Sequence, residues 1–198
     1  MKKLFWFFQV SFIVISCSQI NEAPQKVAFL GDSQVRNWDL DYWFPFNSNV
    51  NNGIPGYRAS DLVNSIDETG PADRRIVWIG INDIIQLSQT YDSQTTIDSV
   101  LNSFRFLLGN LGTDDLVLPI CPVTIGFDDQ YLQDLNGIVY EVNSGLNAMC
   151  SETNLQFIDI AQPLTDGTCL KDAFTQDGLH LNNPGYEIIS KKLLPFLY

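Results

Sequence analysis

Short apolar runs alternate with amphipathic stretches along the chain. The runs are rich in β-branched and aromatic residues, which is typical of strands buried in a sheet. A weaker candidate lies near residues 46–50, and the four clear runs are 27–30, 75–80, 116–120 and 155–160. The pattern therefore predicts about five strands.

Between these runs, apolar residues recur at intervals of three and four, the period of a helix with one buried face. The stretches with this period are 59–66, 97–111, 131–149 and 186–193. Asn183 followed by Pro184 predicts the start of the last helix, with Asn183 as the capping residue. Strands that alternate with helices predict one α/β domain with a mainly parallel sheet covered on both faces.

The N-terminus predicts an export signal. A basic start precedes a mostly apolar stretch, residues 4–15, that is too short to span a bilayer comfortably. The four residues that end at Cys17 resemble the bacterial lipoprotein signal, in which the Cys becomes the lipidated first residue. We therefore expect a signal peptide over 1–16, a lipidated Cys17 with a tether over 17–25, and the domain over 26–198. A plain secretory signal, giving a periplasmic or secreted protein, and an uncleaved anchor are the alternatives.

Charge and cysteine content limit the ligands, disulfides and cofactors that this chain can be expected to have. The 198 residues include 11 basic and 23 acidic side chains, a net charge of −12, which disfavours nucleic acid and favours neutral or weakly charged substrates. Cys150 and Cys169 are the preferred disulfide pair because Cys121 lies in an apolar run, and three free thiols are the alternative. With one histidine, no Cys-x-x-Cys pair and no Gly-rich phosphate loop, neither a metal nor another cofactor is expected.

Four short motifs carry candidate chemistry. They are Gly31-Asp32-Ser33, Gly53-Ile54-Pro55-Gly56, Gly80-Ile81-Asn82-Asp83 and Asp177-Gly178-Leu179-His180. The first and third follow apolar strands, and the carboxyl ends of parallel strands gather at one edge of a sheet. We therefore expect Ser33 and Asn82 to lie close together, with His180 brought to them by the last loop.

These residues supply the roles that an ester-cleaving serine enzyme needs. Ser33 is the candidate nucleophile, His180 is the candidate base as the only histidine, and Asp177 can orient its imidazole. The Ser33 backbone N–H, the Gly56 backbone N–H and the Asn82 side chain are candidate donors to an oxyanion. Taken singly, each residue is also typical of a helix cap, a turn or a solvated loop.

Together, the four motifs make residues 26–198 resemble the SGNH hydrolases, also called GDSL esterases and lipases. The resemblance implies a flavodoxin-like three-layer αβα sandwich and hydrolysis through an acyl-enzyme. It implies a triad of Ser33, Asp177 and His180, and an oxyanion hole formed by Ser33, Gly56 and Asn82. Gln34 departs from the Leu or Ile that is common after the serine in this family. The contact that this position makes with the acyl group of the substrate is therefore left open by the resemblance.

The substrate is less closely defined by the sequence. Trp38 and Trp43 follow the nucleophile and are candidates to line an acyl or sugar site, with core packing as the alternative. Because the chain lacks a long apolar lid insertion, we expect short acyl groups, particularly acetyl esters of glycans. A lysophospholipase or thioesterase and a non-catalytic glycan-binding surface lipoprotein are the rival functions, and the oligomeric state stays open.

Overall fold

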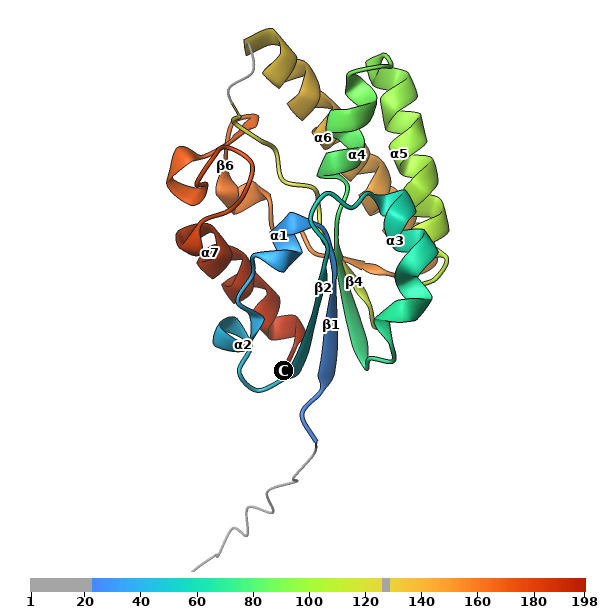
Figure 1. Ribbon diagram of the computed structural model, residues 1–198, viewed down its shortest axis with the longest axis vertical. Helices are drawn as coiled ribbons and strands as arrows, with labels where there is room; N and C mark the ends of the chain where they lie inside the picture. Colours follow the sequence, from blue (N-terminus) through green and yellow to red (C-terminus); the bar gives the residue numbers. More distant parts are fainter. Residues whose placement is uncertain (1–22, 126–128) are drawn as a thin grey trace, which may run out of the picture.

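A computed structural model describes residues 23–125 and 129–198 (Figure 1). A five-stranded sheet forms its centre, with strand order β2-β1-β3-β4-β5 and every neighbouring pair parallel. Its strands are β1 (Lys26–Gly31), β2 (Ser48–Gly53), β3 (Arg74–Trp78), β4 (Leu116–Val117) and β5 (Gln156–Phe157). The predicted α/β fold is confirmed. The predicted signal peptide and Cys17 lie outside the described residues.

Helices cover both faces of this sheet. The helices are α1 (Ser33–Arg36), α2 (Leu40–Trp43), α3 (Ala59–Ser65), α4 (Ile81–Ser88), α5 (Ser93–Leu108), α6 (Asp129–Thr153) and α7 (Asn183–Leu193). Short 3-10 turns lie at Ile66–Thr69, Gln162–Leu164, Asp172–Phe174 and Leu194–Phe196, and a two-stranded antiparallel ribbon pairs β6 (Thr165–Asp166) with β7 (Cys169–Leu170). None of the described helices combines the length and the apolar run that a bilayer span requires.

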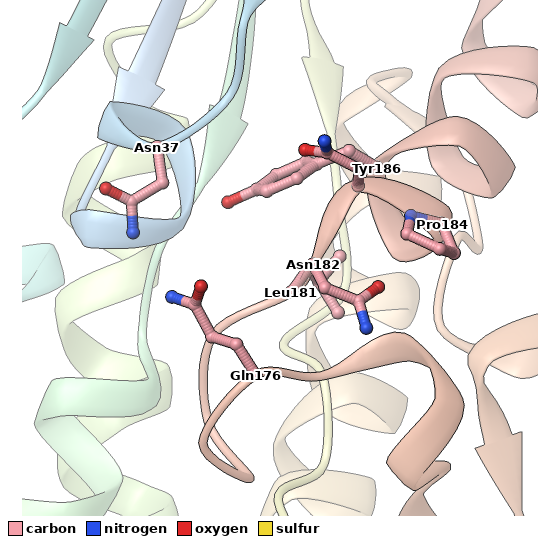
Figure 2. A pocket seen from close by; sticks show the side chains of 7 residues that line it. Asn37, Gln176, Leu181, Asn182, Pro184 and Tyr186 are labelled. Atoms are coloured by element: carbon pink, nitrogen blue, oxygen red, sulfur yellow. The ribbon is translucent and has the colours of Figure 1, made fainter.

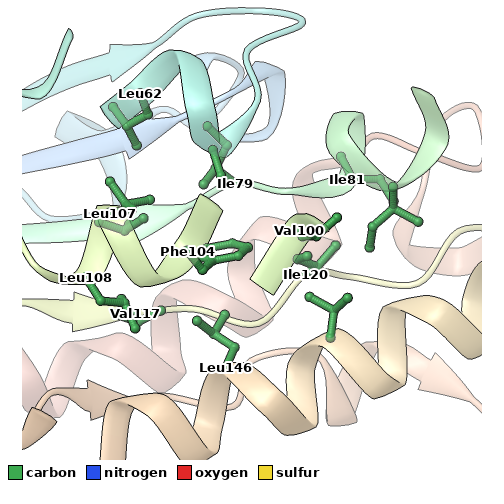
Figure 3. Close-up of a cluster of buried hydrophobic side chains, with 14 of the residues drawn as sticks. Leu62, Ile79, Ile81, Val100, Phe104, Leu107, Leu108, Val117, Ile120 and Leu146 are labelled. Carbon is green, nitrogen blue, oxygen red and sulfur yellow. The ribbon is translucent and has the colours of Figure 1, made fainter. Parts of the chain in front are cut away.

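Two separate hydrophobic cores result from the alternation of side chains along the strands. Ala28 and Leu30 of β1 join what we call the aliphatic core, which packs under α3, α4, α5 and α6 (Figure 3). Val27 and Phe29 point the other way, into what we call the aromatic core, under α1, α2 and α7. The ring contacts of the aromatic core link Phe29, Trp38, Phe44, Trp78 and Tyr186.

The strands β4 and β5 are shorter than the apolar runs that predicted them. The Leu118 N–H still donates to the Val77 carbonyl at 2.9 Å, but beyond it side chains of α6 take over the hydrogen bonds of the chain. Asn143 accepts from the Ile120 N–H and donates to its carbonyl, both at 2.8 Å. Asn136 accepts from the Val123 N–H at 2.9 Å and donates to its carbonyl at 2.8 Å. These amides hold the segment that borders the site.

Two of the differences from the predicted helices lie close to the site. Asn182, one residue earlier than predicted, caps α7 by accepting from the Gly185 N–H at 3.1 Å, and Pro184 lies in the first turn. The helix α4 was not predicted, because its first residues continue the apolar run of β3 and mask the change of period.

The preferred disulfide between Cys150 and Cys169 is not formed, and both thiols are free, as is that of Cys121. Cys169 lies beside α6, where its Sγ is 3.6 Å from the Asn136 Nδ2. Cys150 lies about four turns further along the same helix, roughly 20 Å away at 1.5 Å per residue. A disulfide requires Cα atoms within about 7 Å of each other.

Candidate active site

Ser33 lies where β1 turns into α1, at the carboxyl edge of the sheet. Asp32 caps this helix, and its Oδ1 accepts from the Gln34 N–H at 2.9 Å. Ser33 is the first residue of α1, so the helix itself does not use its backbone N–H. Gly31 is required just before the turn because a Cβ there would run into the Trp78 carbonyl of the neighbouring strand.

His180 and Asp177 reach Ser33 from the loop before α7, which we call the base loop (residues 175–182). The His180 Nε2 lies 2.9 Å from the Ser33 Oγ, and its Nδ1 lies 2.7 Å from the Asp177 Oδ2. A carboxylate can only accept, so Nδ1 carries the ring proton and Nε2 is free to accept from the serine hydroxyl. The three side chains thus form one hydrogen-bonded chain.

The Asp177 carboxylate also holds its own loop in place. Its Oδ1 accepts from the His180 N–H at 2.7 Å and from the Leu179 N–H at 3.0 Å. Partial burial raises the pKa of Asp177, but the hydrogen bonds from the His180 ring and from these two N–H groups outweigh burial and leave the pKa below its ordinary value. Asp177 therefore stays ionised beside the imidazole at neutral pH.

The candidate oxyanion donors come from three adjacent strands. Ser33 follows β1, Asn82 follows β3, and Gly56 lies in the loop after β2, which we call the oxyanion loop (residues 54–58). The Asn82 Nδ2 donates to the Tyr57 carbonyl at 2.9 Å and lies 3.4 Å from the Asp32 Oδ2. The Asn82 NH₂ group is thus held between the oxyanion loop and Asp32, the residue before Ser33. Gly56 is exposed and has a φ of +81°, a conformation that favours glycine.

Two buried aspartates support the site: Asp32 stabilises the turn into α1, and Asp83 makes a contact that the sequence did not reveal. Asp83 accepts from the Ala59 N–H at 2.9 Å, which joins α4 to the start of α3, and burial raises its pKa to about 7. Burial also raises the pKa of Asp32 to about 6, although the Gln34 N–H and the nearby His180 oppose that shift. Their positions in the first and third motifs were the available signal.

Gln34 is directed at the base loop instead of at a substrate. Its side chain is buried, its Nε2 donates to the Leu179 carbonyl at 2.6 Å, and its Oε1 accepts from the Leu181 N–H at 3.3 Å. The Tyr186 hydroxyl donates to the Gln34 carbonyl at 2.7 Å. The sequence marked Gln34 as unusual, but it did not reveal this contact.

The two candidate tryptophans have different surroundings. Trp38 is only 2% exposed and its indole donates to the Ser190 Oγ at 3.0 Å, so it belongs to the aromatic core and its predicted contact with substrate is wrong. Trp43 is half-buried at the end of α2, where it lines a pocket of about 420 Å³ together with Tyr42.

A second pocket, of about 550 Å³, lies beside α1 (Figure 2). Asn37, the residue after α1, and Gln176 from the base loop lie on facing sides of it. Three further residues of its lining, Asn182, Asn183 and Pro184, come from the end of the base loop and the start of α7. Within the described residues, no three His, Cys, Asp or Glu side chains are grouped so that they could hold a metal ion.

A Ser–His–Asp chain beside grouped N–H donors, at the carboxyl edge of a parallel sheet, defines the class of serine hydrolases. Residues 29–188 match the model of the GDSL-like Lipase/Acylhydrolase family. The chain therefore belongs to this family and is a serine ester hydrolase. The resemblance to the GDSL esterases and lipases and the predicted enzyme class are confirmed.

Solved structures share the fold. A Streptococcus pneumonia protein with the provisional description of a platelet activating factor has 28% identity and a TM-score of 0.72, covering 91% of this chain and 87% of that one. A GDSL-like lipase from Bacteroides thetaiotaomicron has 17% identity and a TM-score of 0.71, covering 87% of each chain. An acetylxylan esterase from Geobacillus stearothermophilus has 19% identity and a TM-score of 0.62, covering 87% of this chain and 94% of that one. The comparison with curated proteins gives no match.

Proposed function

We propose that the protein hydrolyses short-chain O-acyl esters of glycans, acetyl esters foremost, through an acyl-enzyme. The observation that carries this proposal is the hydrogen-bonded chain from Asp177 through His180 to Ser33. Such a chain makes a serine hydroxyl nucleophilic at neutral pH, because the imidazole accepts the hydroxyl proton as the oxygen attacks.

Each step can be assigned to a residue. The Ser33 Oγ bonds to the ester carbonyl carbon while its proton passes to the His180 Nε2, and the imidazolium is stabilised by Asp177. The oxyanion accepts from the Ser33 and Gly56 N–H groups and from the Asn82 amide. The bond from carbonyl carbon to alkoxy oxygen then breaks, and His180 gives its proton to the departing alcohol. Water, activated by His180, releases the acid from Ser33.

Several observations favour a glycan alcohol and a short acyl group. The chain has no long apolar insertion that could cover a fatty acyl chain. The pocket beside α1 is lined largely by amide side chains, which suit sugar hydroxyls better than methylene groups. The acetylxylan esterase with this fold acts on such an ester, which supports the same substrate class for this chain.

A graded series of p-nitrophenyl esters tests the acyl preference. We expect acetate to be turned over faster than octanoate or decanoate, and faster turnover of the long chains would point to a lysophospholipase or thioesterase instead. Fluorophosphonate labelling tests the nucleophile: one adduct at Ser33 is expected, and Ser33→Ala should abolish it. No adduct on the wild-type protein would favour the non-catalytic glycan-binding lipoprotein.

The proposed cellular setting is the cell envelope, with a lipid on Cys17. The sequence before Cys17 and the polar tether after it support this setting. Growth with labelled palmitate should label the wild-type protein but not a Cys17→Ser variant. Absence of label from the wild type would leave a plain secretory signal as the better interpretation.

A further inference from the structure

The pockets beside α1 and α2 are neighbours, because Asn183 and Pro184 line both, and we call the two together the groove. Backbone hydrogen bonds connect the lining of the groove to two catalytic residues. The Asn37 N–H donates to the Ser33 carbonyl at 3.0 Å, and the Gln176 N–H donates to the His180 carbonyl at 3.1 Å. Two residues of the lining are therefore each one backbone hydrogen bond away from the nucleophile and the base.

The chemistry of the groove changes along its length. Near Ser33 the side-chain amides of Asn37, Gln176 and Asn183 have no hydrogen-bond partner within the described part of the chain, so they can both donate and accept. At the far end, Tyr42 is 70% exposed and meets the half-buried Trp43 edge to face, with 4.9 Å between the ring centroids. An amide region followed by an aromatic platform matches the hydroxyls and the apolar face of a pyranose.

The charges in the groove favour a neutral glycan over an anionic one. The carboxylates of Asp39 and Glu187 line the pocket that contains Trp43, and none of the described residues that line this pocket is basic. Asp39 accepts from the Tyr42 N–H at 3.2 Å as the cap of α2, and Glu187 is paired with Lys191 at 2.6 Å. Asp39 is therefore the carboxylate of this pocket that has no cationic partner among the described residues. A glycan bearing uronic acids or phosphates would meet like charge there.

We propose that this groove binds the leaving-alcohol side of the substrate as a chain of at least two neutral sugar units, with the acetylated unit beside Asn37 and Gln176 and the next unit on Trp43. The inference rests on the proposed esterase function and adds where the polymer lies. It assigns specificity to α1, α2 and the start of α7, away from the oxyanion loop.

The test compares two substrates on the same variants, an O-acetylated neutral tetrasaccharide and p-nitrophenyl acetate. Trp43→Ala and Asn37→Ala should each raise KM for the tetrasaccharide by about three- to tenfold, the range of one stacking or hydrogen-bonding contact. The loss on p-nitrophenyl acetate, which carries no sugar unit, should be smaller than the loss on the tetrasaccharide in both variants. Phe106→Ala, which removes a 61% exposed ring of α5 on the opposite face of the sheet, is the matched control.

Three results would overturn the groove: equal KM for wild type and variants, an equal loss on both substrates, or a wild-type enzyme that cleaves p-nitrophenyl acetate but not the tetrasaccharide. If the wild type cleaves neither ester and takes no fluorophosphonate, the proposed function itself fails. An acetylated uronate oligosaccharide should have a higher KM than the neutral one.

A different observation supports a second inference. The Gln34 side chain bonds to the peptide groups on both sides of His180, through the Leu179 carbonyl and the Leu181 N–H. These partners are 145 and 147 residues away along the chain. We infer that Gln34 is a positioning residue that joins the backbone of the nucleophile helix to that of the base and so sets the distance from Ser33 to His180.

Gln34→Met keeps the length of the side chain and removes both hydrogen bonds. We expect kcat to fall about ten- to a hundredfold with little change in KM, since a shift near 1 Å in a catalytic group can cost 10²-fold. His180 is the only histidine, so its ring signals in a proton NMR spectrum need no assignment, and the Nδ1–H resonance should move or broaden. Ser190→Ala, which removes the buried bond to Trp38, should lower stability without changing this resonance.

Gln34→Glu is the second variant, because it keeps the acceptor for Leu181 and loses the donor to Leu179. It should lose less kcat than Gln34→Met. A folded Gln34→Met with wild-type kcat and an unchanged His180 resonance would overturn the inference. If Gln34→Met does not fold, a wild-type kcat and resonance in Gln34→Glu would overturn it equally.

Discussion

The base loop and the oxyanion loop flank Ser33 but are held very differently. In the base loop, Thr175 Oγ1 donates to the His180 carbonyl and accepts from the Gly178 N–H, both at 2.8 Å, and the Gly178 carbonyl accepts from Thr124 at 2.7 Å. In the oxyanion loop, residues 54–56 are exposed, and one turn hydrogen bond joins the Tyr57 N–H to the Ile54 carbonyl at 3.1 Å. The loop is tied to the rest of the site by Ile54, which donates to the Gly31 carbonyl at 2.9 Å, and by the Tyr57 carbonyl, which accepts from Asn82.

This difference separates two catalytic tasks. Proton transfer needs His180 at one distance from Ser33, and a network of side-chain and backbone bonds fixes it. The Gly56 N–H depends on one backbone conformation and on the Asn82 contact. Changes in the base loop should therefore act through single side chains with large effects, and changes in the oxyanion loop should act through backbone placement with smaller ones.

The largest effect is expected for Asp177→Asn. The amide can donate to the imidazole and so favours the wrong tautomer, which should reduce kcat by about 10⁴-fold, as in other serine triads. Steady-state turnover of p-nitrophenyl acetate is the measurement, with thermal unfolding as the control for folding. A loss below tenfold would mean that Asp177 does not orient His180.

Asn82→Ala should rank second. Loss of one oxyanion donor typically costs about 10²- to 10³-fold in kcat. The same change removes the contact to the Tyr57 carbonyl, so the Gly56 N–H should be displaced as well. Measurement of kcat and KM should show the loss in kcat, and an effect on KM alone would contradict an oxyanion role.

Gly56→Ala should rank third. A Cβ at this position meets no atom within 4 Å, so the cost comes from the φ of +81° and is roughly 1–2 kcal/mol. If the loop relaxes to avoid it, kcat should fall about tenfold. Gly70→Ala is the matched control, with a φ of +74° and open space, and it should lose similar stability at unchanged kcat.

The smallest effect concerns the link between α4 and the start of α3. With a folded-state pKa of about 7, Asp83 keeps its proton in the folded protein at pH values where the unfolded chain has released it. Its contribution to the free energy of unfolding therefore falls as pH rises from about 4 to 7. Denaturant melts of Asp83→Asn should show a flatter pH dependence there, by an amount on the order of 1 kcal/mol. Parallel curves would contradict this.

The triad residues could be predicted because each stands in a short motif after a strand or before a helix, and parallel strands bring their ends together. The roles of Gln34 and Asn143 could not be predicted, because each side chain bonds to backbone groups far along the chain. No local sequence pattern shows which backbone groups a strand leaves unpaired. Trp38 was misplaced for a related reason. The turn from α1 to α2 decides which aromatic residue points inward. Four aromatic residues within seven positions show neither helical nor strand periodicity, so the sequence does not indicate which of them is buried.

The two asparagines of α6 have a consequence for slow motions of the protein. The N–H groups of Ile120 and Val123 belong to no strand, yet each donates to a side chain held by the longest helix. In deuterium exchange they should be protected like residues of β3 instead of like a connecting segment. Since Thr124 donates to the Gly178 carbonyl, opening of this segment would carry the base loop with it. Exchange at these two amides would thus report how often the resting enzyme loses its catalytic geometry.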